Sequence, residues 1–520
     1  MSATISRTGL SVVLGLALTG GAMPGALVPV AALAKDADAA GQGFCRRPGP
    51  MPALGPEADR QRHLRRPIPR VRPVPMASAP DIASSREARD GGALMAPLPP
   101  PPPPPPAMAM DSAAPVVVTG AKVGSSAPRR TAKVVPDASS ALRVPFPPPR
   151  PQPEPQSGML TAGEHDDLLN PELYANYVRQ SDLGQQVRAL PVLDTARLIT
   201  VEVKDARGRP APFVPVTLRC SDGNSLTFTT QADGTVVFFP GMDRLSDTVH
   251  VRAGQGEWRA LDVPASAGTG RVGFTVGSAQ KVTKLDLGLV VDVTGSMADE
   301  LRFLQAELDA IVASLAARHP ELDIRVGMTF YRDTGDEFVT RTFPFTPDIA
   351  RARGQIGQQY ATGGGDYEEA MQDALVRAAK QDWREDAVKT LLLVADAPPH
   401  AEDVPTAWLA AEHLRAKRVH VVPVGASGVG PLAEYVMRAM AAATQSRYTF
   451  LTDDSGIGNP HAPPAIDCYL VTRLDKLLTR VIDSQVSGRR IEPDKADVIR
   501  EVGQYDAGKC VLPPDFGRQG

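Results

Sequence analysis

The chain has 520 residues, of which 51 are prolines, roughly twice the usual share. Of these prolines, 28 lie in residues 35–160, a segment with too few large apolar residues to bury a core. That segment holds 17 basic and 10 acidic residues, so residues 161–520 carry a net charge of −11. An acidic folded part excludes the nucleic-acid binders that rely on a basic surface.

The N-terminus has the features of an export signal. Arg7 precedes an apolar run from Leu10 to Leu33, and Ala32-Leu33-Ala34 fits the small-residue rule for cleavage before Lys35. We therefore expect residues 1–34 to be a signal peptide and the protein to be periplasmic, cell-surface or secreted. The alternative is an uncleaved membrane anchor, because the run is long enough to span a bilayer. Only in that case do we expect contact with a membrane.

Residues 35–160 are predicted to form a disordered, proline-rich linker. Its eight consecutive prolines, Pro99 to Pro106, favour a stiff polyproline II spacer that holds the folded part away from the membrane.

Four cysteines, an even number, are compatible with an oxidising compartment. Cys468 and Cys510 are the pair that we would first test for a disulfide. Cys220 lies on the inward-facing set of a predicted strand, which favours a buried thiol.

Residues 161–190 are predicted to be a short helical segment. Glu164-His165-Asp166-Asp167 stands before apolar residues at helical spacing, such as Leu169 and Leu173. Acidic and polar residues in this position are typical of a helix cap, so we expect a docking helix to begin here.

Residues 196–278 change to the alternating pattern of β-strands. Ile199, Val201 and Val203 alternate with polar residues, and Asp233-Gly234 supplies a turn. The pattern predicts a small antiparallel all-β sandwich. The stretches VEVKDARGRPAPFVPVTLRC and TTQADGTVVFFP resemble transthyretin-like or carboxypeptidase-regulatory-like modules, which implies a spacer or binding unit without chemistry of its own.

Residues 284–488 alternate strands with helices and are followed by a C-terminal tail, 489–520. The apolar run Leu285 to Val291 is typical of a central strand buried on both faces. The next apolar residues recur at helical spacing: Leu301, Leu304, Leu308, Ile311 and Leu315. Together these patterns predict an α/β fold, a doubly wound and mostly parallel sheet. In such sheets ligands bind at the carboxyl ends of the strands.

Three loops at that edge carry hard oxygen ligands. The first holds Asp292, Thr294 and Ser296, the glycine loop Thr362–Asp366 offers Asp366, and Asp396 follows a later strand. We expect these five side chains to share one Mg²⁺, with Mn²⁺ or Ca²⁺ as alternatives.

These loops resemble the von Willebrand factor type A (VWA) domain, in particular the exported bacterial type and the branch associated with alpha-kinases. The pieces that carry the resemblance are DVTGSM, YRD, GGGD and VADAPPH. It implies a metal-ion-dependent adhesion site (MIDAS) whose cation binds a protein ligand through an acidic side chain or a neutral oxygen. Many members have Thr where Asp366 stands, so Thr362 is the alternative ligand from that loop. His400 is a further candidate, either as a ligand or beside the ligands.

We therefore expect an exported, metal-dependent protein-binding or adhesion module that is not an enzyme. The alternatives are a hydrolase that uses the same metal, with His400, Glu368 or Glu369 as general base, and a structural envelope protein with a vestigial site. Both Glu368 and Glu369 are equally well explained as acidic first-turn residues of a helix. The chain contains no His-Glu-x-x-His or Gly-x-Ser-x-Gly motif.

Overall fold

The computed structural model describes residues 43–55, 154–181, 183, 190–265 and 268–511. The predicted signal peptide, the run Pro99 to Pro106 and residues 512–520 lie outside these ranges. Within the described ranges, no helix is both long enough and apolar enough to cross a membrane.

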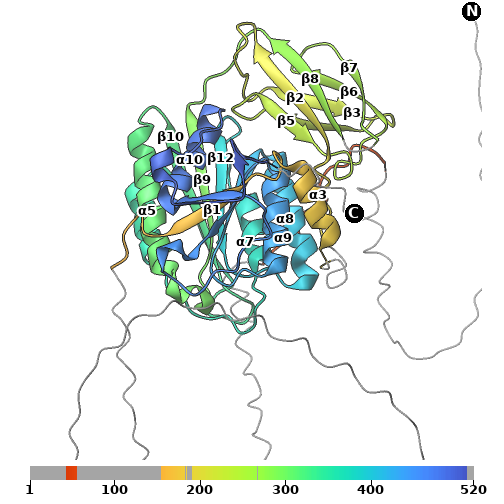
Figure 1. Ribbon diagram of the computed structural model, residues 1–520. Helices are drawn as coiled ribbons and strands as arrows, with labels where there is room; N and C mark the ends of the chain where they lie inside the picture. The colour runs from red at the N-terminus through yellow and green to blue at the C-terminus, as the bar shows by residue number, and fades with distance from the viewer. Residues whose placement is uncertain (1–42, 56–153, 182, 184–189, 266–267, 512–520) are drawn as a thin grey trace, which may run out of the picture. The chain divides into compact units, whose positions relative to one another are not determined.

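A nine-stranded mixed sheet forms the centre of an α/β fold (Figure 1). In spatial order its strands are β11 (Thr340–Thr346), β10 (Asp323–Tyr331), β9 (Lys284–Asp292), β12 (Val388–Ala395), β13 (Val419–Gly425), β14 (Tyr448–Leu451), β1 (Thr161–His165), β15 (Tyr469–Arg473) and β16 (Arg500–Val502). The adjacent strands from β10 to β14 are parallel, as predicted. The outer pairings are antiparallel, so the expectation of a mostly parallel sheet is only partly met. At one end of the sheet, β11 returns antiparallel to β10, and at the other end β1 and β16 are added from outside residues 284–488.

Helices cover both faces of this sheet. One face carries α5 (Leu301–Arg318), α6 (Ile349–Gly357) and α10 (Leu474–Ser487), and the other carries α7 (Met371–Lys380), α8 (Val404–Ala416) and α9 (Pro431–Ala443). The run Leu285 to Val291 lies in β9 and is buried on both faces, and the predicted apolar stripe forms α5. These two predictions are confirmed.

Strand β1 lies between β14 and β15, inside the sheet. The prediction that Glu164 and His165 cap a helix is wrong, because both belong to this strand. Helix α3 (Pro171–Gln180) begins later, after Asn170. A strand can form here because the buried Glu164 carboxylate accepts hydrogen bonds from Arg447 Nη1 (2.8 Å) and Arg480 Nη1 (2.7 Å).

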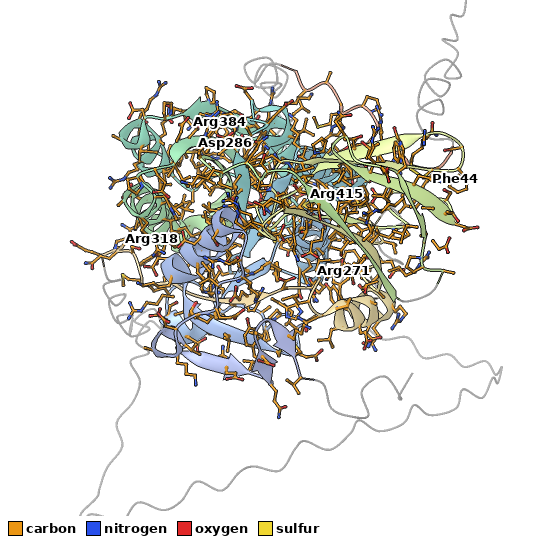
Figure 2. The ribbon with its side chains drawn as sticks, turned by 90° about the horizontal axis from the view of Figure 1, so that it is seen from above. Phe44, Arg271, Asp286, Arg318, Arg384 and Arg415 are labelled. Carbon is orange, nitrogen blue, oxygen red and sulfur yellow. A yellow bond between two sulfur atoms is a disulfide. The ribbon has the colours of Figure 1, made fainter. Side chains whose placement is uncertain are left out.

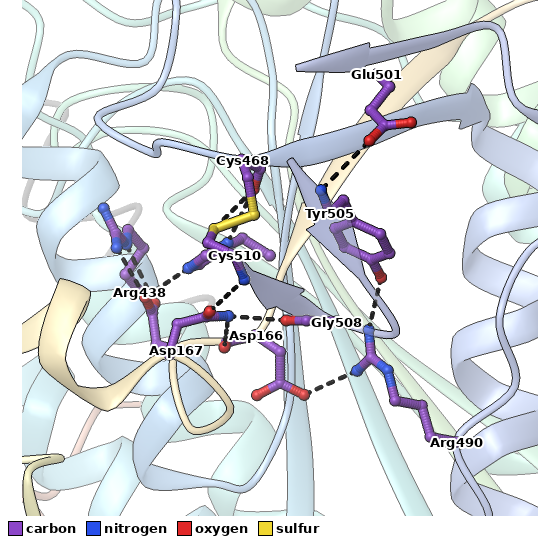
Figure 3. Close-up of a disulfide and its surroundings, with 11 residues drawn as sticks. Asp166, Asp167, Arg438, Cys468, Arg490, Glu501, Tyr505, Gly508 and Cys510 are labelled. Atoms are coloured by element: carbon purple, nitrogen blue, oxygen red, sulfur yellow. Dashed lines mark hydrogen bonds and ion pairs between the residues drawn. A yellow bond between two sulfur atoms is a disulfide. The ribbon is translucent and has the colours of Figure 1, made fainter. Parts of the chain in front are cut away.

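The predicted C-terminal tail contributes to the fold through β16 and the hairpin of β17 (Tyr505–Asp506) and β18 (Lys509–Cys510). A disulfide joins Cys468 to Cys510, with an S–S distance of 1.99 Å (Figure 3). The Cys510 amide also donates to Asn170 Oδ1 (2.8 Å). The tail is thus fixed to the segment that follows β1.

Residues 197–276 form two small sheets. One contains β5 (Thr235–Phe238), β2 (Arg197–Asp205) and β8 (Gly268–Val276), and the other contains β4 (Ser225–Thr229), β3 (Pro215–Arg219), β6 (Thr248–Ala253) and β7 (Arg259–Asp262). Their inward side chains share one apolar cluster. The predicted purely antiparallel pairing is wrong in one place, because β2 and β8 are parallel.

Ion pairs with buried carboxylates join elements that lie far apart in the sequence, and Figure 2 labels Asp286, Arg384 and Arg415, which take part in them. In β9, Asp286 accepts from Arg325 Nη2 (2.9 Å) and Arg384 Nε (2.9 Å). In α8, Arg415 Nη1 donates to Asp243 Oδ1 (2.7 Å) of the β-rich part. The Asp286 contacts lie within the α/β part, whereas the Arg415–Asp243 pair connects it to the β-rich part.

Residues 43–55, which were predicted to belong to the disordered linker, lie against the folded part. Cys45 forms a disulfide with Cys220, so the interpretation of Cys220 as a free buried thiol is wrong. The carbonyl oxygens of Gly49 and Pro52 lie within hydrogen-bond distance of His413 Nε2 (2.7 Å) and Lys380 Nζ (2.6 Å). Both ends of the proline-rich segment are therefore attached to the same folded part.

We predict that Cys45→Ser lowers the free energy of unfolding by roughly 2–5 kcal/mol, because the lost cross-link no longer restricts the unfolded chain. Limited proteolysis should then cleave near residues 43–55. Denaturant unfolding of the single variant and of a Cys45→Ser, Cys220→Ser double variant checks this, and the double variant should match the single one. Unchanged stability in both would contradict it.

Candidate metal centre

The first loop of the site begins where β9 ends, at Asp292. Its side chain is fully buried, and its Oδ1 accepts from the Thr294 amide (2.9 Å) and the Thr294 hydroxyl (2.7 Å). Its Oδ2 is also buried and has no hydrogen bond of normal geometry among the described residues, although the buried Tyr331 hydroxyl lies near enough to act on the carboxylate. The exposed Ser296 follows, with its hydroxyl 3.1 Å from Thr294 Oγ1. The three predicted oxygen ligands of this loop therefore lie together.

Asp396 stands at the same edge, directly after β12. Strand β12 pairs in parallel with β9, and the register places Val394 beside Val291. Asp396 is 2% exposed, and its Oδ1 has no hydrogen-bond partner among the described residues. Two buried carboxylates thus each present an unpartnered oxygen.

Ionising these two carboxyl groups is unfavourable without a cation. Burial, and then the charge of Asp396, raise the pKa of Asp292 to about 7. Burial raises the pKa of Asp396 to about 6, although the Ser296 hydroxyl partly opposes the shift. The fit of a divalent cation is therefore good, because it would stabilise both charges and accept the two free oxygens.

The glycine loop lies directly on the first loop. Its Gly363 carbonyl accepts from the Gly295 amide (3.0 Å), and the Thr362 amide donates to the Val293 carbonyl (3.1 Å). Gly364 has a φ of +73°, and a Cβ there would lie 2.8 Å from Glu369 Oε1. Close approach and left-handed backbone therefore explain the glycines. This packing places Thr362 next to the loop that carries Asp292.

Asp366 does not lie as expected. Its ligand atom groups with those of Asp333 and His400, all within 4.8 Å of one another, and this group does not include Asp292 or Asp396. The physical reason is the left-handed turn at Gly363 and Gly364 between Thr362 and Asp366. His400 likewise lies beside Asp333, with its Nε2 2.8 Å from Asp333 Oδ1.

Glu369 lies beside the candidate site, where the sequence suggested either a general base or an acidic first-turn residue of a helix. Helix α7 begins later, at Met371, and the Glu369 amide donates to the Pro398 carbonyl (3.0 Å). The side chain is 2% exposed, and its Oε2 has no partner among the described residues. Burial, and then the charges of Asp292 and Asp333, raise its pKa to about 9. Local periodicity carries no signal for such a burial.

Further polar side chains next to the first loop form hydrogen bonds with one another. Glu300 is fully buried, accepts from the Ser427 amide (3.1 Å) and lies 2.6 Å from His461 Nε2. Asp299 accepts from the Ser427 hydroxyl (3.2 Å). His461 and Ser427 come from loops that carry no recognisable motif in the sequence.

No family model matches this chain. The chain is similar to the alpha-protein kinase vwkA of Dictyostelium discoideum, with 27% identity over 121 residues. That match covers 23% of this chain and 19% of the kinase, so it spans about a fifth of the relative's length.

Solved structures also match, including two from Bacteroides species. They are the conserved hypothetical protein BatB from Bacteroides thetaiotaomicron, with 15% identity and a TM-score of 0.27, and an aerotolerance-related membrane protein from Bacteroides fragilis NCTC 9343, with 13% identity and a TM-score of 0.26. Each match covers 39% of this chain and 98% of the other. Any inference about function therefore rests on the geometry of the site.

Proposed function

We propose that the α/β part is a VWA-type, metal-dependent protein-binding module, with a MIDAS-like Mg²⁺ or Mn²⁺ site at the carboxyl edge of its sheet. One observation carries this proposal: two buried carboxylates, Asp292 and Asp396, each present an unpartnered oxygen beside the Thr294 and Ser296 hydroxyls. Buried polar atoms in proteins are almost always satisfied, and a cation would satisfy these.

Asp292, Thr294, Ser296 and Asp396 would hold the cation. Thr362, rather than Asp366, is the proposed ligand from the glycine loop, because its amide is bonded to the first loop. Two carboxylates balance a divalent charge, so the cation keeps its attraction for one oxygen of a partner. An acidic side chain or a neutral oxygen of a protein ligand would then complete the coordination.

We propose binding rather than hydrolysis as the role of this site. Of the possible general bases, Glu369 has a raised pKa that favours its protonated form near neutral pH in the absence of a cation. The His400 ring is already engaged with Asp333. A protonated Glu369 cannot act as a base, and the contact with Asp333 directs one ring nitrogen of His400 away from the first loop.

We further propose that the protein is exported and works in the cell envelope or outside the cell. Two disulfides, Cys45–Cys220 and Cys468–Cys510, are typical of oxidising compartments. We propose that the β-rich part is transthyretin-like and has no catalytic role.

We predict that the immobilised full chain retains a partner from an envelope extract in Mg²⁺ and releases it when a chelator is added. Asp396→Asn should abolish retention, because it removes one of the two metal-facing charges. The control is Glu402→Gln, which removes an exposed charge at the same edge and should retain the partner. Retention that survives both the chelator and Asp396→Asn would refute metal-dependent binding.

A further inference from the structure

A second group of metal-ligating side chains lies at the same edge. Asp333 follows β10, Asp366 lies in the glycine loop, and His400 follows β12, so three separate loops converge. Asp333 is 8% exposed, His400 is half-buried and Asp366 is exposed, so the group opens to solvent. Its ligand atoms all lie within 4.8 Å of one another.

The distance between Asp333 and His400, the two less exposed residues of the group, suits a single ion. Asp333 Oδ1 and His400 Nε2 are 2.8 Å apart. Two ligands bound at right angles to one metal, with bonds of about 2.1 Å, lie about 3 Å apart. The two atoms are therefore close enough to bind one cation, which would replace the hydrogen bond between them.

A separate observation points to a positive ligand here. Glu369 is 2% exposed and its Oε2 has no partner among the described residues. The negative charges that act on it include Asp333 and Asp336 as well as Asp292 and Asp396. Its backbone pairs with Pro398 and Pro399, directly before His400. A buried carboxyl group without a partner thus lies next to this cluster.

We propose that Asp333, Asp366 and His400 form a second cation site, separate from the one at Asp292 and Asp396, which takes a divalent transition metal such as Mn²⁺ or Zn²⁺. One imidazole with two carboxylates suits these metals, whereas Mg²⁺ and Ca²⁺ favour sites made of oxygen alone. The two sites share none of these ligands. The proposal of the second site can therefore fail without affecting the proposed adhesion site.

The test is a titration of Zn²⁺ into the metal-stripped full chain in millimolar Mg²⁺, followed by calorimetry and native mass spectrometry. We expect one equivalent of Zn²⁺ that Mg²⁺ does not displace. His400→Asn and Asp333→Asn should weaken its affinity at least tenfold, whereas Asp292→Asn should change it less than twofold.

His250→Asn, at an exposed histidine in β6, is the matched control and should bind Zn²⁺ like the wild type. Circular dichroism and melting of His400→Asn should match the wild type, because its ring is near the surface. Zn²⁺ affinity that is unchanged in His400→Asn, or lost equally in Asp292→Asn, would overturn the proposal of a separate site. The absence of any Zn²⁺ binding would do so too, while leaving the Mg²⁺ site untouched.

Discussion

We expect Glu164→Gln to lower the free energy of unfolding by about 3–5 kcal/mol, the usual effect of breaking a buried ion pair from one side. Glu164 is 1% exposed and lies on β1, and both arginines that it binds, Arg447 and Arg480, are also buried. The amide can accept hydrogen bonds but leaves two buried positive charges without a counter-charge. Denaturant unfolding measures the loss.

The exposed Glu172→Gln on α3 is the matched control, and it should change stability by less than about 0.5 kcal/mol. If Glu164→Gln were as stable as this control, β1 would not be an integral strand of the sheet. A fragment that begins at residue 284 lacks β1 entirely, and we expect it not to fold.

The same ion pair gives a pH dependence with a definite sign. Burial alone raises the pKa of Glu164, but Arg447 and Arg480 outweigh it and lower the pKa to about 2. A carboxyl group with a lowered pKa in the folded state adds stability above its unfolded pKa of about 4.5. That contribution is lost as the pH falls from about 4.5 to 2, and Glu164→Gln should remove this part of the pH profile.

The second large effect is expected at Asp292, where Asp292→Asn should stabilise the metal-free protein at pH 8. The pKa of Asp292 is raised to about 7, so the folded state holds its proton more tightly than the unfolded state does. Wild-type stability therefore falls between about pH 4 and pH 7, and the penalty is complete above pH 7. Asn does not ionise, and its amide oxygen can still accept from Thr294. We expect a gain on the order of 2 kcal/mol.

Mg²⁺ should make the wild type more stable than Asp292→Asn. At a concentration one hundred times the Kd, a cation bound only by the folded state adds about 2.7 kcal/mol to the wild type. Asp292→Asn should gain nothing. The wild-type gain should shrink at pH 5, because protons compete for the same carboxylates. Melting curves with Mg²⁺ and with chelator at the two pH values check this. A lower stability of metal-free Asp292→Asn at pH 8 would show that the carboxylate has a purely structural role.

Apolar residues at strand or helical spacing correctly predicted one strand and one helix of the fold. The run Leu285 to Val291 specifies β9, and the helical spacing from Leu301 specifies α5. The edge at which the loops meet was also predicted, because parallel strands end at one edge of a sheet, and Asp292 and Asp396 do lie there.

The features that sequence patterns could not predict depend on partners that lie far away along the chain. Glu164 looks like a cap residue until Arg447 and Arg480, which are 283 and 316 residues away, are known to neutralise it within a strand. The partner of Cys45 is 175 residues away. Asp366 groups with Asp333 and His400 and follows two left-handed glycines, Gly363 and Gly364, at which a Cβ would meet Asp336 and Glu369.

The central claim, a cation at Asp292 and Asp396, is tested most directly by calorimetric titration of Mg²⁺ into the chelator-treated full chain at pH 8. We predict that the wild type binds one equivalent of Mg²⁺ and that Asp292→Asn binds none. No binding to the wild type, or equal binding to both proteins, would contradict the claim.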